Sequence, residues 1–364
     1  MNHSRMRTVV MLGAIAATLF VARPAHGADS TDHVVWSAPI DQAFDLVTDG
    51  AGVVVVSGDD AVHALGRDGH EQWTAHVAGT TMGQPALGRG VVLVGGDHSV
   101  TALARADGSL RWQRPMAAAT HSLAIAGEVA VAGDEEGALT AFDALTGAPR
   151  WSVKYPGLLW SGARSDAVSG SLVATWHRDP RAAVRVFDLA TGALRWEAPT
   201  AVATAAPVVR GGLVLLAIGD GNRHARVEAR DLATGQLRWQ TPVPASFEEG
   251  IEPAADDRSV AVIDHFGVVS LLDRQSGRLL WQHDLARALL QTRVSLTRDR
   301  VVVTSFSGDV FVLDRHDGHT VARWGWRRLD GYPVATLRPA WRGPDRLLVA
   351  LRLREWAVQL RVLP

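Results

Sequence analysis

The sequence contains no cysteine among its 364 residues. A chain without cysteine can form no disulfide framework and can carry no lipid on an N-terminal cysteine, so its core alone must stabilise the fold. The chain also lacks a Gly-x-Ser-x-Gly elbow, a His-Glu-x-x-His helix and a phosphate-binding loop. These absences exclude the best-marked classes of hydrolase, metalloprotease and nucleotide-binding enzyme.

The chain also contains almost no lysine and has almost no net charge. Lys154 is the only lysine among 37 lysine and arginine residues, and the formal net charge is −1. The arginines are dispersed along the chain and form no basic stripe with interleaved aromatic residues, which is the usual mark of a nucleic-acid-binding surface. We therefore expect no nucleic-acid partner.

Long apolar runs are missing beyond the N-terminal region. Val9 to Ala22 is an apolar run of 14 residues that follows two arginines, whereas a helix needs about 20 residues to span a bilayer. Ala25-His26-Gly27 places small residues where a signal peptidase cleaves. We predict an export signal over residues 1–27, cleaved near Gly27, and one domain over residues 28–364. A retained membrane anchor is the alternative.

What the chain does have is a repeat marked by tryptophan. Glycine stands four residues before tryptophan in six copies, and aspartate usually stands four residues before that glycine. Such a segment predicts a hairpin whose turn has positive φ at glycine and whose return strand carries the tryptophan. The recurring residues are Trp36, Trp73, Trp112, Trp151, Trp196, Trp239, Trp281 and Trp324, at intervals of 37 to 45 residues.

Repeats of this length with glycine and tryptophan at fixed offsets are typical of propeller blades. Upstream of each hairpin, short β-rich runs supply two more strands, so we predict an all-β fold of four-stranded antiparallel blades. Seven repeats are complete, and an eighth stops before its tryptophan strand. We expect the N-terminal strand that carries Trp36 to complete this last blade and close an eight-bladed ring, which removes exposed strand edges.

The frame Ala-x-Asp-x-x-Thr-Gly-x-x-x-Trp resembles the PQQ-type β-propeller repeat and covers about residues 34 to 363. This family includes quinoprotein dehydrogenases and the non-enzymatic accessory of the outer-membrane β-barrel assembly machine. The resemblance implies that each tryptophan docks between an alanine of its own blade and the backbone of a neighbouring blade. The implied pairs are Trp112 with Ala102, Trp151 with Ala141, and Trp239 with Ala229.

The seventh repeat departs from this register, because Trp324 stands six residues after Gly318 and Ala322 occupies the expected place. We also expect looser or repacked docking where a larger residue replaces the alanine of the frame. Those residues are Val186, Leu271 and Val312.

Resemblance to the quinoprotein dehydrogenases does not extend to their chemistry. Those enzymes are longer and hold the quinone beside Ca²⁺, commonly with a vicinal cysteine disulfide, which this chain cannot form. We interpret Asp59-Asp60 and the acidic run Asp134 to Glu136 as hairpin turns, and His98, His177, His224 and His265 as exposed turn residues. We expect no cofactor, no metal and no catalytic residues.

Function is best sought where the repeat is irregular. The fourth repeat is the longest and holds extra aromatic residues, while an acidic connection lies further along the chain. Aromatic and aliphatic side chains near loops favour a protein-binding patch. The candidate partner-binding residues are Leu158, Leu159, Trp160, Trp176, His177, Phe247, Glu248 and Glu249. The alternative is that Trp160 caps the central channel and Trp176 packs in the core.

These patterns predict an exported, non-catalytic propeller that acts as a protein-binding or scaffold module of the bacterial cell envelope. It would be periplasmic or secreted and monomeric by itself, would have no direct lipid anchor, and would bind an envelope protein, as the assembly accessory does. The alternative is a quinone-dependent dehydrogenase or a small-molecule binder that uses the central funnel.

Overall fold

The structure is a computed structural model. It describes residues 43–48, 52–57, 60–66, 68–80, 83–88, 90–157, 159, 163–166, 168–176, 182–200, 203–204, 206–219, 225–243, 252–264, 266–286, 292–305, 309–325, 340–341, 347–352 and 358–361. All of the secondary structure in these residues is β-strand, and every strand pairing is antiparallel, as predicted. The predicted export signal and the strand around Trp36 lie outside the described residues.

The strands form consecutive sheets in chain order, and each of the first seven sheets is called a blade here. Blades 1 to 4 comprise β1 (Ala43–Thr48), β2 (Gly52–Ser57), β3 (Ala61–Gly66) and β4 (Glu71–His76); β5 (Ala86–Gly88), β6 (Val91–Gly96), β7 (Ser99–Ala104) and β8 (Leu110–Pro115); β9 (Thr120–Ala126), β10 (Val129–Asp134), β11 (Ala138–Asp143) and β12 (Pro149–Lys154); β13 (Arg164–Asp166), β14 (Ser171–Trp176), β15 (Ala183–Asp188) and β16 (Leu194–Pro199).

Blades 5 to 7 and a last, three-stranded sheet follow. They comprise β17 (Ala203–Thr204), β18 (Val208–Arg210), β19 (Leu213–Gly219), β20 (Ala225–Asp231) and β21 (Leu237–Val243); β22 (Ala254–Ala255), β23 (Ser259–Ile263), β24 (Val268–Asp273) and β25 (Leu279–Asp284); β26 (Arg293–Leu296), β27 (Arg300–Thr304), β28 (Asp309–Asp314) and β29 (Thr320–Gly325); β30 (Ala340–Trp341), β31 (Leu347–Arg352) and β32 (Val358–Arg361). Blade 5 counts an extra strand because β17 and β18 both pair with β19.

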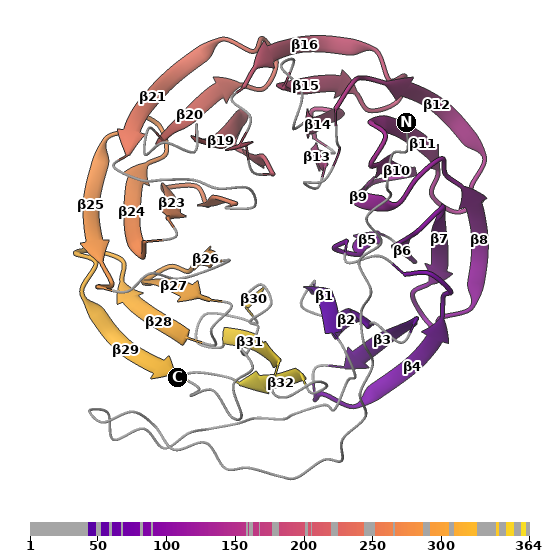
Figure 1. Cartoon of the computed structure of the whole chain (residues 1–364), viewed down its shortest axis with the longest axis horizontal. Helices are drawn as coiled ribbons and strands as arrows, with labels where there is room; N and C mark the ends of the chain where they lie inside the picture. Colours follow the sequence, from indigo (N-terminus) through magenta and orange to yellow (C-terminus); the bar gives the residue numbers. More distant parts are fainter. Residues whose placement is uncertain are drawn as a thin grey trace, which may run out of the picture.

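The sheets stand around a ring in the order of the chain (Figure 1). Strands such as β1, β5, β9 and β26 face the centre, while β4, β8, β12, β16, β21, β25 and β29 form the perimeter. This arrangement is that of a β-propeller. Among the described residues the last sheet has three strands, and the strand expected to complete it lies outside them.

The hairpin between the third and fourth strands forms as the repeat predicts. In blade 3, Asp143 Oδ1 accepts bonds from the backbone N–H groups of Leu145 and Thr146 at 3.1 and 3.0 Å and from the Thr146 hydroxyl at 2.9 Å. Gly147 has φ of 69°, a left-handed conformation that L side chains adopt only at a cost. The same carboxylate contacts recur at Asp188 and Asp231. Local turn chemistry therefore fixes each hairpin.

A detail of these hairpins was not predicted. The arginine before the tryptophan reaches back to the turn, so that Arg150 bonds Asp143 Oδ2 at 2.7 Å. Arg195 with Asp188 and Arg238 with Asp231 repeat the contact. These bonds, together with those of the turn, hold the pKa of Asp188 and of Asp231 down to about 2. Both carboxylates are therefore ionised at neutral pH.

Tryptophan joins each blade to the next. Trp112 of blade 2 donates from Nε1 to the Ala144 carbonyl of blade 3 at 3.0 Å, and its ring lies against Gly147, where a Cβ would be only 2.6 Å from Trp112 Cδ2. Five further junctions repeat this contact: Trp73 with Arg105 and Gly108, Trp151 with Leu189 and Gly192, Trp196 with Leu232 and Gly235, Trp239 with Arg274 and Gly277, and Trp281 with Arg315 and Gly318.

The implied pairing of tryptophan with the alanine of its own blade is also present, because Ala102, Ala141 and Ala229 stand opposite their tryptophans. The expectation of looser docking opposite Val186 and Leu271 is wrong for the hydrogen bond. Trp196 and Trp281 donate at 2.8 Å, as short as any of the six. The turn of the next blade sets this bond, so a larger residue in the same blade does not lengthen it. At the seventh repeat, Ala322 stands opposite Val312, and the side chain of Trp324 lies outside the described residues.

Candidate functional site

Leu159 and Trp176, two of the predicted partner-binding residues, are core residues. Both have 0% exposed surface and belong to one apolar cluster between blades 3 and 4. Trp176 donates from Nε1 to the Gly137 carbonyl at 3.2 Å and packs edge-on against Phe187. A side chain with no exposed surface cannot contact a partner, so the partner-binding prediction is corrected for these two. Trp176 instead packs in the core, which is the alternative given in the sequence analysis.

The other predicted partner-binding residues, which are Leu158, Trp160, His177, Phe247, Glu248 and Glu249, lie outside the described residues. Their role stays a prediction. Leu159 is the only member of the stretch 158–160 that the structure describes, and it packs in the cluster between blades 3 and 4.

Arg185 is a buried cation beside this cluster that the sequence did not single out. Its guanidinium carbon lies 4.2 Å from the ring centre of Tyr155 and 4.9 Å from that of Trp176, a cation–π geometry. Its Nε donates to Glu197 at 3.0 Å. Only 6% of its side chain is exposed, and among the described residues its buried Nη1 has no hydrogen-bond partner.

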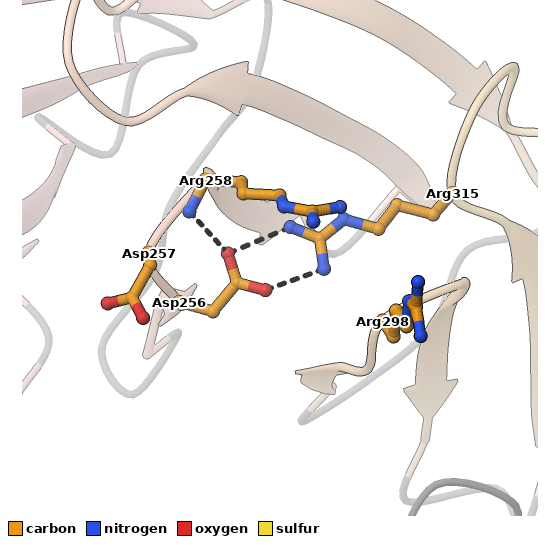
Figure 2. Close-up of a pocket in the computed structure, with 5 residues that line it drawn as sticks. All are labelled: Asp256, Asp257, Arg258, Arg298 and Arg315. Carbon is orange, nitrogen blue, oxygen red and sulfur yellow. Dashed lines mark hydrogen bonds and ion pairs between the residues drawn. The ribbon is translucent and has the colours of Figure 1, made fainter.

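A polar hollow lies where blade 6 meets blade 7 (Figure 2), lined by Asp256, Asp257, Arg258, Arg298 and Arg315. Asp256 belongs to the turn between β22 and β23, where its Oδ1 accepts the backbone N–H groups of Arg258 and Ser259 at 2.8 and 3.0 Å. An aspartate that bonds the backbone two and three residues ahead favours a tight turn. This turn places Arg258 at the edge of the hollow.

Arg315 links three turns around the hollow. Its guanidinium forms a two-bond pair with Asp256 at 2.6 and 2.8 Å and also donates to the Thr297 carbonyl and to Ser259 Oγ. Burial acts to raise the pKa of Asp256, but the bonds from Arg315 and from the turn outweigh it and lower that pKa to about 2. Only 9% of the Arg315 side chain is exposed. Its ion pair with Asp256 therefore connects blade 6 to blade 7.

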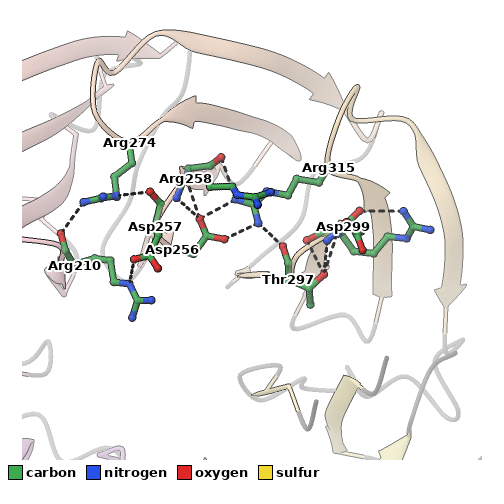
Figure 3. Close-up of polar contacts among 10 residues, drawn as sticks. Arg210, Asp256, Asp257, Arg258, Arg274, Thr297, Asp299 and Arg315 are labelled. Atoms are coloured by element: carbon green, nitrogen blue, oxygen red, sulfur yellow. Dashed lines mark hydrogen bonds and ion pairs between the residues drawn. The ribbon is translucent and has the colours of Figure 1, made fainter. Parts of the chain in front are cut away.

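Arg258 and Arg298 are the two arginines of the hollow whose charge is not paired within the described residues. Both are exposed, and among the described residues neither guanidinium has a hydrogen bond or an ion pair. Asp257, by contrast, is paired with Arg210 at 2.9 Å. Arg274 extends the polar surface toward blade 5 by bonding the carbonyls of Asp257 and Arg210 (Figure 3).

Sequence reasoning missed this hollow, although one signal for it exists. Arg274 and Arg315 each follow the aspartate of a hairpin, and their carbonyls accept the docking tryptophans. The same position holds the buried residues Ala144, Leu189 and Leu232 in blades 3 to 5. Arginine also occupies this position in blade 2, as Arg105, so a charged residue there is only a weak signal for the hollow.

Of the acidic and histidine residues that the sequence analysis places in turns, Asp60, Glu135, Glu136 and His98 lie in bends or turns, whereas Asp59, His177, His224 and His265 lie outside the described residues. Asp134 caps the turn after β10 by accepting the N–H groups of Glu136 and Ala138, and its burial raises its pKa despite those bonds. Ligand atoms of Asp314, Asp317 and His319 lie within 4.8 Å of one another. Asp314 is already paired with Arg300 at 2.8 Å, and His319 with Asp317 at 2.6 Å. These internal ion pairs account for the grouping.

Comparison with known proteins gives a family and a fold. The family model described as outer membrane protein assembly factor BamB matches residues 24–158, 137–233 and 223–351. A search of curated proteins returned no match. In the residues that the structure describes, no helix is long and apolar enough to cross a membrane.

Several solved propellers are similar in structure. BamB from Moraxella catarrhalis is 17% identical with a TM-score of 0.73, over 91% of this chain and 98% of that chain. The computationally designed Ika8 protein is 16% identical with a TM-score of 0.72, over 91% and 98%. Quinohemoprotein alcohol dehydrogenase ADHIIG from Pseudomonas putida HK5 is 14% identical with a TM-score of 0.65, over 87% of this chain and 70% of that chain. At these identities the likeness establishes the fold alone.

Proposed function

Because this chain belongs to the outer membrane protein assembly factor BamB family, we propose that it is a non-catalytic, protein-binding propeller of the bacterial cell envelope that takes part in outer-membrane protein assembly. The match of the family model from residue 24 to residue 351 carries the proposal. The resemblance predicted from the tryptophan repeat is thereby confirmed at the level of the family.

The proposal includes three finer features. Residues 1–27 are an export signal, the mature chain acts in the periplasm without a lipid of its own, and it is monomeric by itself. The ring has eight blades, and the strand that carries Trp36 completes the last one. The absence of cysteine supports the missing lipid. Completion of the last sheet, of which the described residues form three strands, would cover its open edge.

The fold suits a scaffold because its blades are joined rigidly. Each of six junctions combines a tryptophan hydrogen bond with ring-to-glycine contact. Such a frame holds exposed loops in fixed positions while tolerating sequence change in the loops themselves. Binding surfaces on a preorganised frame lose less conformational entropy when a partner docks.

Cross-linking in the native envelope followed by affinity capture tests the proposal. We expect capture of a component of the outer-membrane assembly machine or of an outer-membrane precursor. The Leu158→Ala, Trp160→Ala double variant should reduce capture if the predicted loop of the fourth repeat contributes. Leu145→Ala is the matched control, because Leu145 is an exposed turn residue at 50% exposure. Capture of no envelope protein by the unmodified chain would contradict the proposed role.

A quinone-dependent dehydrogenase remains the second candidate, favoured only by the fold likeness to quinohemoprotein alcohol dehydrogenase ADHIIG. Titration with pyrroloquinoline quinone and Ca²⁺, followed by a dye-reduction assay with alcohols, distinguishes the two. We expect neither saturable binding nor turnover. Saturable binding with turnover would replace the scaffold proposal.

A further inference from the structure

We propose that the hollow between blades 6 and 7 is a docking site for a short acidic segment of a protein partner, with Arg258 and Arg298 as the groups that bind its carboxylates. This inference rests on the proposed function, because it gives the chemistry of one surface by which the propeller would hold its partner. It concerns a different place from the loop of the fourth repeat.

The acidic side chains that line the hollow are paired with arginines, whereas two of its arginines have no acidic partner among the described residues. Asp256 is neutralised by the two-bond pair with Arg315, and Asp257 is paired with Arg210. Arg258 and Arg298 line the same hollow without an anionic partner among the described residues. The local excess is therefore positive, although the net charge of the whole chain is −1. An anion that enters the hollow meets guanidinium groups whose bonds are still available.

The two free arginines stand on turns that are held together. Arg258 follows the turn made by Asp256, and Arg298 lies in the turn between β26 and β27, where Thr297 Oγ1 accepts the N–H groups of Asp299 and Arg300. Arg315 bonds both turns, through the Asp256 carboxylate and the Thr297 carbonyl, and its own N–H donates to the Asp299 carbonyl. Figure 3 shows this chain of contacts. The spacing of the two turns that carry these arginines is thus set by the fold before any ligand binds.

The surroundings favour a carboxylate-bearing peptide over a phospholipid surface. A planar guanidinium pairs with a carboxylate through two parallel bonds. Asp257 has 75% of its side chain exposed beside the hollow, and Asp299 is exposed in the neighbouring turn. A broad anionic surface would meet these carboxylates and be repelled, whereas a narrow segment can reach the arginines between them.

Fluorescence anisotropy with a labelled octapeptide of glutamate and glycine tests the proposal on the full mature chain. We expect saturable binding at low ionic strength that weakens with added salt. The Arg258→Gln, Arg298→Gln double variant should weaken binding by about tenfold or more, since both charge-assisted pairs are lost. Both side chains are exposed and have no partner within the described part of the chain, so thermal unfolding of this variant should match that of the parent.

The Arg111→Gln, Arg278→Gln double variant is the matched control, because it removes the same charge from exposed arginines outside the hollow. It should keep binding within about twofold of the parent. Equal weakening in the control, or no peptide binding by the parent, would overturn the proposal. So would binding of phosphatidylglycerol vesicles, but not of the peptide, that depends on Arg258 and Arg298.

Failure of this inference is distinguishable from failure of the proposed function. Envelope capture should persist for the parent chain and fall for the Arg258→Gln, Arg298→Gln variant. Capture that is equal for both would overturn the docking site and leave the scaffold role intact. Absence of capture by the parent would instead contradict the scaffold role.

Discussion

At the scale of single residues, the repeat combines a glycine that allows the hairpin to turn with a tryptophan that docks against the next blade. Gly147 needs φ of 69° for its own hairpin and also leaves the space that the Trp112 ring of the preceding blade fills. One glycine therefore serves both a turn and a blade junction. Among the described residues, 16 glycines have positive φ, and Gly108, Gly147, Gly192, Gly235, Gly277 and Gly318 share this double role.

We predict that Gly147→Ala destabilises the protein by about 2 to 4 kcal/mol, because the new Cβ adds left-handed strain and would lie 2.6 Å from Trp112 Cδ2. Gly127→Ala is the control, because Gly127 also has positive φ, of 58°, but nothing within 4 Å of its added Cβ. It should cost only about 1 to 2 kcal/mol. Urea unfolding measures both, and equal losses would show that ring contact adds nothing.

At the scale of elements, turns of neighbouring blades are tied by charged side chains as well as by tryptophan. Arg315 of the β28–β29 hairpin bonds Asp256 in the turn of the preceding blade. In blades 3 to 5 the equivalent residue is apolar and buried. The junction between blades 6 and 7 has therefore exchanged apolar packing for an ion pair, which makes it sensitive to pH.

We predict that Arg315→Leu lowers stability at pH 7 by about 1 to 3 kcal/mol, less than for a fully buried pair because Asp256 is partly exposed. The pKa of Asp256 is lowered from 3.8 to about 2 in the folded protein. The stability it contributes is therefore fully present above about pH 4 and is lost as the pH falls through 2.

The stability difference between parent and Arg315→Leu should accordingly be largest above pH 4 and shrink toward pH 2, as measured by urea unfolding at several pH values. Arg298→Leu is the control, because this neighbouring arginine is exposed and has no ion pair with any residue that the structure describes. Its effect should be small and independent of pH. A difference for Arg315→Leu that grows on acidification would contradict the assigned pair.

At the scale of the whole molecule, the blades form a ring whose junctions repeat except near its end. Six junctions have the docked tryptophan, whereas the seventh repeat places Ala322 at that position. The last sheet has three described strands. The register of the repeat therefore changes at this end of the ring.

We predict that deletion of residues 28–40 destabilises the entire propeller. In the proposed ring, the strand that carries Trp36 completes the last sheet and covers its open edge, and the deletion removes this strand. Thermal unfolding should shift to lower temperature and aggregation should increase, since exposed edges promote pairing between molecules. Deletion of residues 28–32 alone is the control and should have little effect. Normal unfolding of the longer deletion would exclude closure by this strand.

In the fourth repeat, the sequence predicts the presence of irregular aromatic residues but not their burial. Trp176 breaks the repeat and is therefore predicted to bind a partner, yet it is fully buried against Phe187 and Gly137. An irregular aromatic residue can equally extend the core or form a surface, and its burial is decided by residues from blade 3. The partner-binding prediction for Trp176 and Leu159 failed for this reason.

The sequence by itself determined the β architecture, the hairpins and the docking tryptophans. Those features depend on turn chemistry within about a dozen residues and on a pattern that repeats, so local patterns are sufficient to predict them. Only the tertiary structure decided which arginines are neutralised and which are free. Asp256 and Arg315 are 59 residues apart, and their pairing leaves Arg258 and Arg298 available. Charges that meet across blades depend on the ring, and no local pattern encodes that meeting.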